Sequence, residues 1–411
     1  MTAARDSTTG IYVSVPFCRS KCTYCNFASG VYPAGEHTRY VQRLIEEMSA
    51  AGGWARRMGV VLPPRVDTIY LGGGTPSLLE PELLAELFAA IRADFDIEAD
   101  AEITVECAPG QLPDPVLEAL ARAGVNRVSL GVQSFVDSEA RGSGRLHDRA
   151  TVERDIDRLR AAGIANINVD LIAGLAGQTI TSWQDSLDAL IAAGVPHASV
   201  YMLEIDEDSR LGRELLAGGG RYRASLVPDE DAIVDMYTSA CERLARAGLI
   251  QYEISNFSRA GFESRHNLRY WQRRPYLGVG LDASSMLRAE SDGEHDDTGT
   301  FVLRSSATAD LKAYLDAAEP PETAWLSPAR QREEAWFLGL RMNAGVKIAE
   351  LEDEFGKATV QPALKTAHSL AERGLLTLDR ETARLTPRGR LISNEIFQEF
   401  LETASEPSLR T

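Results

Sequence analysis

The sequence lacks several patterns that would place it in well-known structural classes. No run of about 18 apolar residues occurs in its 411 residues, so no transmembrane helix is expected. Residues 1–10 are polar and contain no apolar segment of a secretory signal, which favours a cytoplasmic protein. Lys and Arg number 43 against 60 Asp and Glu, a net charge of −17. This balance argues against broad nucleic-acid binding and against a basic membrane anchor.

Cysteine is also scarce, with five residues in the whole chain. An odd and unevenly spaced set in a chain of this length does not make a disulfide framework. Three of the five nevertheless lie within eight residues, at Cys18, Cys22 and Cys25, whereas Cys107 and Cys241 are isolated. The clustered three therefore need an explanation of their own.

Short β-rich segments alternate with amphipathic helical segments over the first part of the chain. Strands are expected at Ile11–Val15, Asp67–Leu71, Glu102–Glu106, Arg127–Gly131, Asn168–Ile172 and Ala198–Leu203. Helices are expected at His37–Gly52, Pro81–Asp94, Asp114–Ala123, Ala150–Ala162 and Thr181–Ala193. Alternation at roughly 30–40 residues per unit predicts βα units and a parallel sheet. Six units in order favour a complete or incomplete barrel, in which functional residues gather at the C-terminal ends of the strands.

The pattern changes after the barrel, which we expect to occupy residues 1–288. A loop is expected at Ala289–Thr300 and a linker rich in Pro, Glu and Ala at Ala318–Pro328, so residues 289–328 are interpreted as a connecting segment. The remaining elements are expected to be helices at Ala329–Leu340, Lys347–Phe355 and Val360–Arg373, a hairpin at Leu375–Asp379 and Thr382–Leu385, and a last helix at Pro387–Leu401. Helices followed by a two-stranded wing predict a small winged-helix-like domain over residues 329–411.

The clustered cysteines have the spacing of metal ligands. They follow the first strand directly as Cys18-Arg-Ser-Lys-Cys22-Thr-Tyr-Cys25, a C-x3-C-x2-C pattern. Thiolates are the usual ligands of iron–sulfur clusters, and three of them leave one iron of a [4Fe–4S] cluster open for chemistry. The alternatives are free thiols or a structural zinc ion, for which His37 is the nearest fourth ligand. The spacing favours the cluster.

Further candidate residues lie at the ends of the later strands. Gly72, Gly73, Gly74 and Thr75 follow the second strand, and glycines let a backbone approach a ligand closely. Polar residues end or follow the other strands, namely Glu106, Gln133, Arg145 and Asp170. Each of them alone is explained as well by a strand-end cap or a buried hydrogen bond. Together they occupy successive strand ends of one expected barrel.

The cysteine pattern, with Tyr24 before the last cysteine, resembles the signature of radical-SAM proteins, and Gly72–Pro76 resembles their GGGTP stretch. In that superfamily S-adenosylmethionine (SAM) chelates the open iron, and an electron from the cluster cleaves it to a 5′-deoxyadenosyl radical. The superfamily fold is a full or partial barrel. The resemblance therefore implies an α/β fold, a partial (β/α)6 TIM-like barrel of the radical-SAM type.

Over Ile11–Met286 the sequence resembles the family of oxygen-independent coproporphyrinogen III oxidases and their relatives. The resemblance implies a SAM site lined by Tyr12, Tyr24, Gly73, Gly74 and Thr75. It implies that Glu106 accepts a hydrogen bond from SAM and that Arg145 pairs with the SAM carboxylate. It also implies that Gln133 and Asp170 hold the ribose hydroxyls. Glu204, at the end of the sixth strand, is expected to contribute mainly through its backbone.

The family has two branches, and two features separate this chain from the true oxidases. The oxidases have C-x3-C-x2-C-x-C, whereas Phe27 stands at the last of those positions here. They also carry an N-terminal extension over the substrate, whereas 17 residues precede Cys18 in this sequence. Both departures argue against coproporphyrinogen decarboxylation.

The other branch, the HemW-like haem chaperones, is marked by H-N-x-x-Y-W. This sequence has His266, Asn267, Tyr270 and Trp271 in that pattern. Histidine is a standard axial ligand of haem iron, and aromatic rings can cover a porphyrin face. The alternative is a buried, hydrogen-bonded patch near the barrel mouth. The first strand has Ser14-Val15-Pro16 where other members often have His-Ile-Pro, so any role of that histidine is missing here.

The resemblance thus implies a haem chaperone that binds a [4Fe–4S] cluster, SAM and haem. It would work in the cytoplasm and approach the membrane to hand haem to an acceptor such as a respiratory haem protein. A homodimer through the cluster region is also expected, since so short an N-terminus leaves the cluster mouth uncovered. The alternatives are a radical-SAM oxidase of coproporphyrinogen III or another tetrapyrrole, and a radical-SAM enzyme acting on an unrelated substrate.

Overall fold

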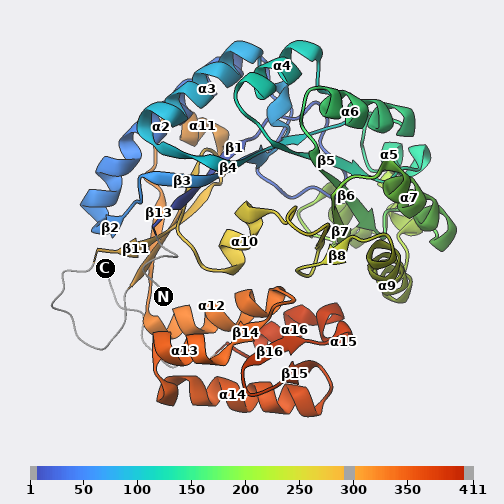
Figure 1. The fold of residues 1–411 in the computed structure, drawn as a ribbon. Coiled ribbons are helices and arrows are strands. Elements are labelled where there is room, and N and C mark those ends of the chain that lie inside the picture. Colours follow the sequence, from blue (N-terminus) through green and yellow to red (C-terminus); the bar gives the residue numbers. More distant parts are fainter. Residues whose placement is uncertain (1–6, 291–300, 402–411) are drawn as a thin grey trace.

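A computed structural model of the protein describes residues 7–290 and 301–401 (Figure 1). Most of the loop expected at Ala289–Thr300 lies outside the described residues, as do residues 1–6 and 402–411. Two parts of the molecule are distinct in Figure 1: a strongly curved sheet with helices on its outer side, and a smaller helical part built from the C-terminal residues.

Six parallel strands form the curved sheet that the sequence predicts. They are β1 (Thr9–Val15), β3 (Arg65–Gly73), β4 (Asp96–Cys107), β5 (Arg127–Gln133), β6 (Asn166–Ala173) and β7 (His197–Met202), neighbours in that order. The connecting helices are α2 (Gly35–Met58), α3 (Pro81–Asp94), α4 (Asp114–Arg122), α5 (Asp137–Gly142), α6 (Arg149–Ala161) and α7 (Ile180–Ala193), with the short 3-10 helix η1 (Pro76–Leu78). The helices lie outside the curve (Figure 1). The predicted α/β partial barrel is confirmed.

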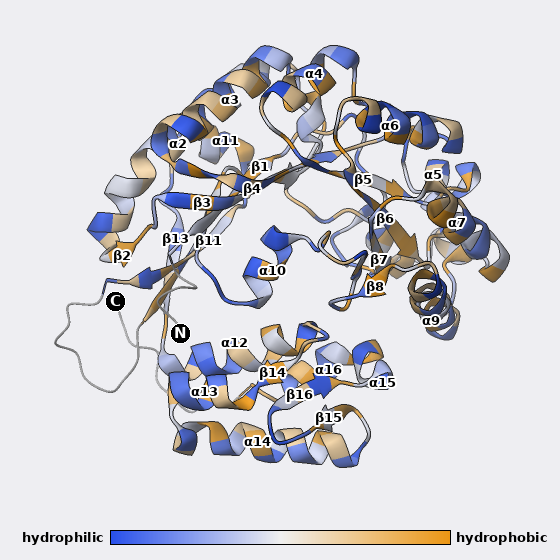
Figure 2. Ribbon diagram, viewed as in Figure 1, coloured by the Kyte–Doolittle hydropathy of each residue, from blue (hydrophilic) through white to orange (hydrophobic). Residues whose placement is uncertain are grey.

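Alternation along the strands decides which side chains enter the barrel. On β4, Ile103 and Val105 are buried in the apolar core under the helices, while Glu102 and Glu106 lie on the opposite face, inside the barrel. On β1, Tyr12 occupies the same inner face between the fully buried Ile11 and Val13. Hydrophilic and hydrophobic residues are interleaved along the outer helices, as amphipathic helices require (Figure 2). The pattern that builds the core therefore also fixes the polar lining of the barrel.

Additional strands extend the sheet at both edges. On one side β10 (Tyr276–Val279), β11 (Ser284–Ala289), β12 (Val302–Ser306) and β13 (Glu322–Leu326) follow β1, with β2 (Val60–Val61) paired to β11. On the other side β9 (Asn256–Ser258) and β8 (Ile250–Gln251) follow β7. The remaining helices of this part are α8 (Arg210–Leu216), η2 (Arg221–Leu226), α9 (Glu230–Arg246), α10 (Arg265–Trp271) and α11 (Leu311–Leu315).

The prediction of a linker at Ala318–Pro328 is wrong. Residues Glu322–Leu326 form β13, which pairs with β12 along its whole length. The strand lies at the sheet edge with mostly exposed side chains, so it lacks the buried apolar residues by which a strand is recognised in a sequence. The strands β12 and β13 therefore belong to the main sheet, while the limits of the domains stay a prediction.

The C-terminal part has the winged-helix-like arrangement expected of it. Its elements are α12 (Pro328–Arg341), β14 (Val346–Lys347), α13 (Ile348–Phe355), α14 (Lys357–Glu372), β15 (Leu376–Leu378), β16 (Thr382–Leu385), α15 (Pro387–Leu391) and α16 (Ser393–Gln398). Two details differ from expectation. The sheet has three strands, because β14 adds to the predicted hairpin. The last helix is divided at Ile392, whose backbone leaves the helical conformation.

Candidate functional site

A cavity of about 760 Å³ lies at the C-terminal ends of the barrel strands and reaches the C-terminal domain. Most of the residues expected at the cluster and SAM sites line it: Cys18, Cys22, Tyr24, Cys25, Gly73, Gly74, Thr75, Glu106, Gln133, Arg145, Asp170 and Glu204. The fold thus gathers side chains that lie almost 200 residues apart in the sequence. Tyr12 and the stretch His266–Trp271 are not among the described residues that line the cavity.

The cysteines occupy a closed loop that begins where β1 ends. The Cys18 N–H donates to the Gly30 carbonyl at 2.8 Å, which brings the two ends of the loop together. The Lys21 ammonium donates to the carbonyls of Phe27 and Ser29, each at 2.7 Å. Backbone bonds from Thr23 to neighbouring segments fix the middle of the loop. The loop is therefore held by groups other than its thiols, which stay available as ligands.

The zinc alternative finds no support in this geometry. The Nδ1 of His37, the expected fourth ligand, lies 3.1 Å from the Glu80 carboxylate instead. Within residues 7–290 and 301–401, no three His, Cys, Asp or Glu side chains converge closely enough for a single metal ion. Three thiols spread along one loop suit a cluster, in which each cysteine binds a different iron.

The three glycines at the end of β3, of which Gly72 and Gly73 belong to the strand and Gly74 follows it, allow this segment to pass closely over the start of the cysteine loop. The Gly74 N–H donates to the Val15 carbonyl at 2.9 Å. A Cβ atom at Gly74 would lie 2.7 Å from the carbonyl oxygens of Val15 and Phe17, and Gly73 has a φ of +93°. A larger residue at either position would thus separate the two strand ends that border the cavity.

Glu106 lies inside the barrel with a proton affinity suited to neutral pH. Burial raises its pKa to about 7, and the negative charge of Asp170 adds to the effect. A hydrogen bond from the Tyr70 hydroxyl to Oε1, at 2.8 Å, acts in the opposite direction. Sequence reasoning missed Tyr70, although its place two residues before Gly72 on β3 puts it on the inner face.

Asp170 is held in a similar way by neighbours that the sequence did not single out. Ser129 donates to Oδ2 at 3.1 Å, and the Asn168 amide donates to Oδ1 at 2.7 Å. Burial raises the pKa of Asp170, and these hydrogen bonds partly offset it. The carboxylate is therefore fixed in orientation before any ligand arrives.

Two polar groups on the cavity wall have unused hydrogen-bonding capacity. The Gln133 Oε1 and the Arg145 Nε are buried and have no hydrogen-bond partner among the described residues. Gln133 has a φ of +69°, an uncommon conformation for a residue with a side chain. Gly131 leaves space for Arg145, whose Nη2 would lie 2.8 Å from a Cβ atom there. Buried polar groups are normally paired, so these two fit a ligand such as SAM bound between them.

The stretch His266–Trp271 forms most of α10, which lies inside the barrel beside β3 and β4. His266 is 1% exposed, with Nδ1 2.9 Å from the Thr68 hydroxyl and Nε2 2.8 Å from the Tyr270 hydroxyl. Burial lowers the pKa of His266 to about 3, so the imidazole is neutral. Both ring nitrogens are thus engaged within the protein, which matches the alternative of a buried, hydrogen-bonded patch.

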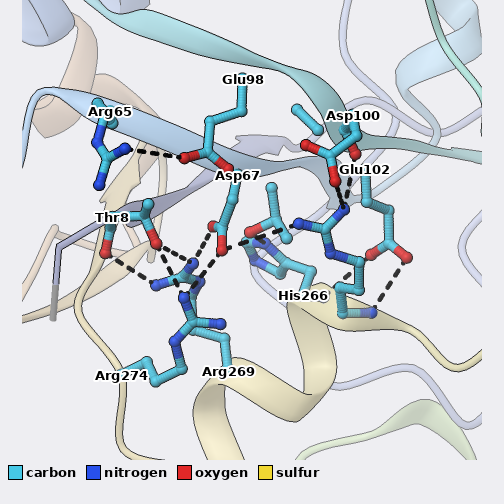
Figure 3. Close-up of polar contacts among 12 residues, drawn as sticks. Thr8, Arg65, Asp67, Glu98, Asp100, Glu102, His266, Arg269 and Arg274 are labelled. Carbon is cyan, nitrogen blue, oxygen red and sulfur yellow. Dashed lines mark hydrogen bonds and ion pairs between the residues drawn. The ribbon is translucent and has the colours of Figure 1, made fainter. Parts of the chain in front are cut away.

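Charged residues of two strands attach α10 to the barrel wall (Figure 3). The Glu102 carboxylate accepts from the backbone N–H groups of Arg265 and His266, at 3.1 and 3.0 Å, and so caps the helix. Asp67 pairs with Arg269 and, at 2.9 Å, with Arg274. Burial alone would raise the pKa of Asp67, but these arginines hold it below its usual value. Glu102 precedes Glu106 by four residues, so α10 lies on the N-terminal side of the cavity.

Tyr70 connects the cavity with α10. Its hydroxyl bonds to Glu106, and its ring stacks on that of His266 with 5.3 Å between centroids. Tyr12 also belongs to this aromatic group, 6.1 Å from Tyr70. The structure therefore places Tyr12 behind the cavity wall, where it supports Tyr70 by packing.

Comparison with known proteins agrees with this geometry. Residues 12–190 match the Radical SAM superfamily, and residues 326–392 match the HemN C-terminal domain. The chain is 34% identical to "Heme chaperone HemW" of Lactococcus lactis over 95% of this chain and 96% of that protein. It is 30% identical to the Escherichia coli protein of the same name, over 95% and 97%.

A solved structure shares the whole fold. The Escherichia coli coproporphyrinogen III oxidase HemN, described as a radical SAM enzyme, superposes with a TM-score of 0.79. The match covers 96% of this chain and 90% of that one at 21% sequence identity. At this identity the likeness concerns the fold, including the C-terminal domain. No helix among the described residues is long and apolar enough to cross a membrane.

Proposed function

Because this chain belongs to the radical-SAM family of oxygen-independent coproporphyrinogen III oxidase-like proteins, in its HemW-type branch, we propose that it is a haem chaperone. It binds a [4Fe–4S] cluster, SAM and haem, and delivers haem to acceptor haem proteins. The observation that carries the proposal is a single cavity with three thiols at one end and a wide, partly apolar space toward the C-terminal domain.

The cluster and SAM occupy the end of the cavity near the cysteine loop. Cys18, Cys22 and Cys25 would hold the cluster through their thiolates, and SAM would bind at the iron that these three cysteines leave open. Arg145 pairs with the SAM carboxylate, and Glu106 accepts a hydrogen bond from SAM. Gln133 and Asp170 hold the ribose hydroxyls, while the Glu204 backbone closes the site. When bound, the cluster and SAM supply one-electron chemistry or stabilise the haem-loaded state.

Haem occupies the wider part of the cavity. Apolar and aromatic side chains suited to a porphyrin line this part: Ile172, Val200, Tyr201, Met202, Leu203, Tyr237, Ile254 and Leu391. His266, Asn267, Tyr270 and Trp271 lie on α10, outside the lining of the cavity, and support haem binding through packing, Trp271 through its contact with Arg341 on the cavity wall. Direct ligation of the haem iron by His266 would require its Nε2 to leave the Tyr270 hydroxyl.

The cavity mouth is suited to a second copy or an acceptor. Phe27 and Leu146 border the cavity and are 65% and 63% exposed, although apolar side chains of this size are more often buried. We propose a homodimer that covers the cluster through this region and opens when haem is handed to a respiratory protein at the membrane. A Phe27→Ser variant should then sediment as a monomer at concentrations where the wild type is dimeric.

The alternative function is oxidation of coproporphyrinogen III, since the SAM end of the cavity suits an enzyme equally well. Two assays on the full, cluster-loaded chain decide between the functions. A haem titration followed at the Soret band should saturate near one haem per chain. Incubation with coproporphyrinogen III, SAM and reductant should give no catalytic turnover. Multiple turnovers to protoporphyrinogen would overturn the chaperone proposal, and so would absence of haem binding.

The part of His266 requires a matched control, because its replacement also removes two hydrogen bonds from the barrel interior. His197 serves this purpose: it is buried, with ring nitrogens 2.6 Å from Asn168 and 2.9 Å from Tyr252. We expect His266→Ala to weaken haem binding more than His197→Ala at a similar loss of thermal stability. Equal haem affinity in the two variants would remove His266 from the haem site.

A further inference from the structure

Arg341 places a positive charge where the cavity reaches the C-terminal domain. It is the last residue of α12 and one of the lining residues. Its carbonyl accepts a hydrogen bond from the Ile254 N–H at 3.2 Å, and the neighbouring Asn343 N–H donates to the Tyr252 carbonyl at 2.9 Å. These backbone bonds fix the end of α12 to the barrel, so the position of Arg341 relative to the cavity is defined by the docking of the two parts.

The Arg341 guanidinium is held by an aromatic ring and has hydrogen-bonding capacity to spare. Its central carbon lies 4.3 Å from the ring centroid of Trp271, the last residue of α10. The Nε is buried and has no hydrogen-bond partner among the described residues. Stacking of this kind orients a guanidinium while its N–H edge remains free to bind an anion.

The nearby carboxyl group of Glu253 is engaged through one of its two oxygens, whereas the other, Oε2, is buried and has no hydrogen-bond partner among the described residues. Burial raises the pKa of Glu253, and the charge of Arg341 acts against this shift. However, Glu253 Oε1 accepts from the Asn256 amide at 2.5 Å and from the Ser255 N–H at 3.0 Å. Its bonds hold the turn before β9 together. Arg341 lies close enough to Glu253 to oppose the rise of its pKa, yet neither Arg341 Nε nor Glu253 Oε2 has a hydrogen-bond partner among the described residues.

We propose that Arg341 is the carboxylate-binding residue of the wide part of the cavity and that it takes a propionate of haem. This inference rests on the proposed haem-chaperone function. A guanidinium binds a carboxylate through two parallel hydrogen bonds, and these are strong away from bulk water. With a net charge of −17, the protein offers no general attraction for an anionic ligand, so one oriented cation has a large effect on affinity and orientation.

The stacking of Arg341 on Trp271 gives Trp271 a role in haem binding that needs no contact with the haem iron. It acts as a positioning residue, because its ring orients Arg341 from the end of α10. Arg145 lies at the cluster end of the cavity and is expected to bind the SAM carboxylate. The two arginines would then bind different groups, Arg145 the carboxylate of SAM and Arg341 a propionate of haem. The H-N-x-x-Y-W stretch would then affect haem binding through Arg341.

The test compares haem with haem dimethyl ester, which has the same ring and iron but no propionate charges. On the full, cluster-loaded chain, Soret titrations should show that the wild type prefers haem by about 10- to 100-fold. Arg341→Gln should weaken haem binding by a similar factor and bind both ligands alike, while Arg341→Lys keeps part of the preference. Trp271→Phe should reduce the preference less than Arg341→Gln does.

Matched variants and a second ligand establish whether the propionate preference belongs to Arg341. Arg388→Gln removes an exposed arginine of the same domain and should change nothing. SAM affinity of Arg341→Gln should equal that of the wild type; a loss confined to SAM would mean that Arg341 binds the SAM carboxylate and overturns the inference. Equal wild-type affinity for haem and its dimethyl ester overturns it as well, while the chaperone proposal survives. Failure of the wild type to bind haem would overturn both this inference and the chaperone proposal. Should Arg341→Gln not fold, the wild type and Arg341→Lys decide the matter.

Discussion

The two ends of the barrel interior differ in how their polar groups are satisfied. Around α10, Glu102 binds two backbone N–H groups, Asp67 pairs with three arginines, and His266 has partners at both ring nitrogens. At the cavity, Gln133 Oε1 and Arg145 Nε are buried and lack partners among the described residues, as do Arg269 Nε and Trp271 Nε1 on α10. The charged groups of the first region are nevertheless paired with one another, whereas the unpaired groups of the second lie on the wall of a cavity that can take a ligand.

This difference explains why the residues of a sequence motif need not be the residues that line the binding cavity. A buried polar group costs free energy unless it is paired, so unpaired groups persist where a ligand completes them. The stretch His266–Trp271 has the residue types of a haem site, but in the structure the side chains of His266 and Tyr270 form hydrogen bonds within the protein. Its effect on ligands is therefore expected through Tyr70 and Trp271, which contact the residues of the wall.

The largest expected effect is loss of the cluster at the cavity without a loss of thermal stability. Cys22→Ser should lose the cluster, with loss of its visible absorption and bound iron, because the described part of the loop holds no thiol besides Cys18 and Cys25 that could replace the ligand. Thermal stability of the cluster-free chain should hardly change, since Lys21 and backbone bonds hold the loop. Cys241→Ser, on α9, is the control and should retain the iron. A full iron content in Cys22→Ser would contradict the ligand assignment.

The next largest effect concerns the stability that the region around α10 gives to the protein. Asp67→Asn should destabilise the protein by about 3–5 kcal/mol, because it leaves the buried Arg269 without its carboxylate partner. The sign of the pH dependence follows from the lowered pKa of Asp67. Its contribution is present above the pKa of the unfolded chain, about 4, and is lost as pH falls through the lower folded value.

Urea unfolding measures this change, and a neighbouring carboxylate provides the control. Asp100 lies 3.7 Å from Arg265 but has an 84% exposed side chain, so Asp100→Asn should cost at most about 1 kcal/mol. Equal costs in the two variants would show that the network around Asp67 is not the support described.

A smaller effect sharpens the description of the cavity. Glu106→Gln should weaken SAM binding by about tenfold at pH 8, where the wild-type carboxylate is ionised and is the stronger acceptor. Since the pKa of Glu106 is raised to about 7, the wild type takes up a proton as pH falls through that value. The difference between the two proteins should therefore shrink toward pH 6 in calorimetric titrations. A constant difference from pH 6 to 8 would mean that Glu106 does not titrate in this range.

The smallest effect tests the connection between the two regions. Tyr70→Phe removes the hydroxyl that donates to Glu106 but keeps the ring on His266, so SAM binding at pH 7 should weaken about fivefold, near 1 kcal/mol. The pKa of Glu106 should rise further, which moves the pH profile of SAM binding upward. Tyr314→Phe is the matched control, because its hydroxyl binds the Glu47 carboxylate outside the barrel interior. An unchanged pH profile of SAM binding in Tyr70→Phe would show that Tyr70 does not connect α10 with the cavity.

Local patterns in the sequence were sufficient for much of the fold. The helix Pro81–Asp94 is found with the expected bounds, and β5 and β6 begin within two residues of their expected starts. Amphipathic spacing, glycine caps and strand alternation are properties of neighbouring residues, so they can be recognised without the tertiary structure. The strand β13 was missed because an exposed edge strand lacks the apolar alternation on which such recognition depends.

The candidate site was predictable for the same reason only in part. The cysteine spacing and the glycines are local patterns, and residues at strand ends converge once a barrel is assumed. Tyr70, Ser129 and Asn168 have no such signal, since a polar residue on the inner face of a strand is also common in a core. Arg341 had no signal at all, because its neighbours in the cavity come from a different part of the chain.

Spacing and periodicity over a few residues were enough to establish a cysteine loop after the first strand, a parallel barrel and a small C-terminal domain. The three-dimensional packing was needed to show that α10 occupies the barrel interior with His266 fully paired and that Arg341 stacks on Trp271 at the cavity. The contacts of His266 with Thr68 and of Arg341 with Trp271 join segments about 70 to 200 residues apart. They depend on tertiary packing, within the barrel for His266 and between the two parts of the molecule for Arg341, which no local pattern encodes.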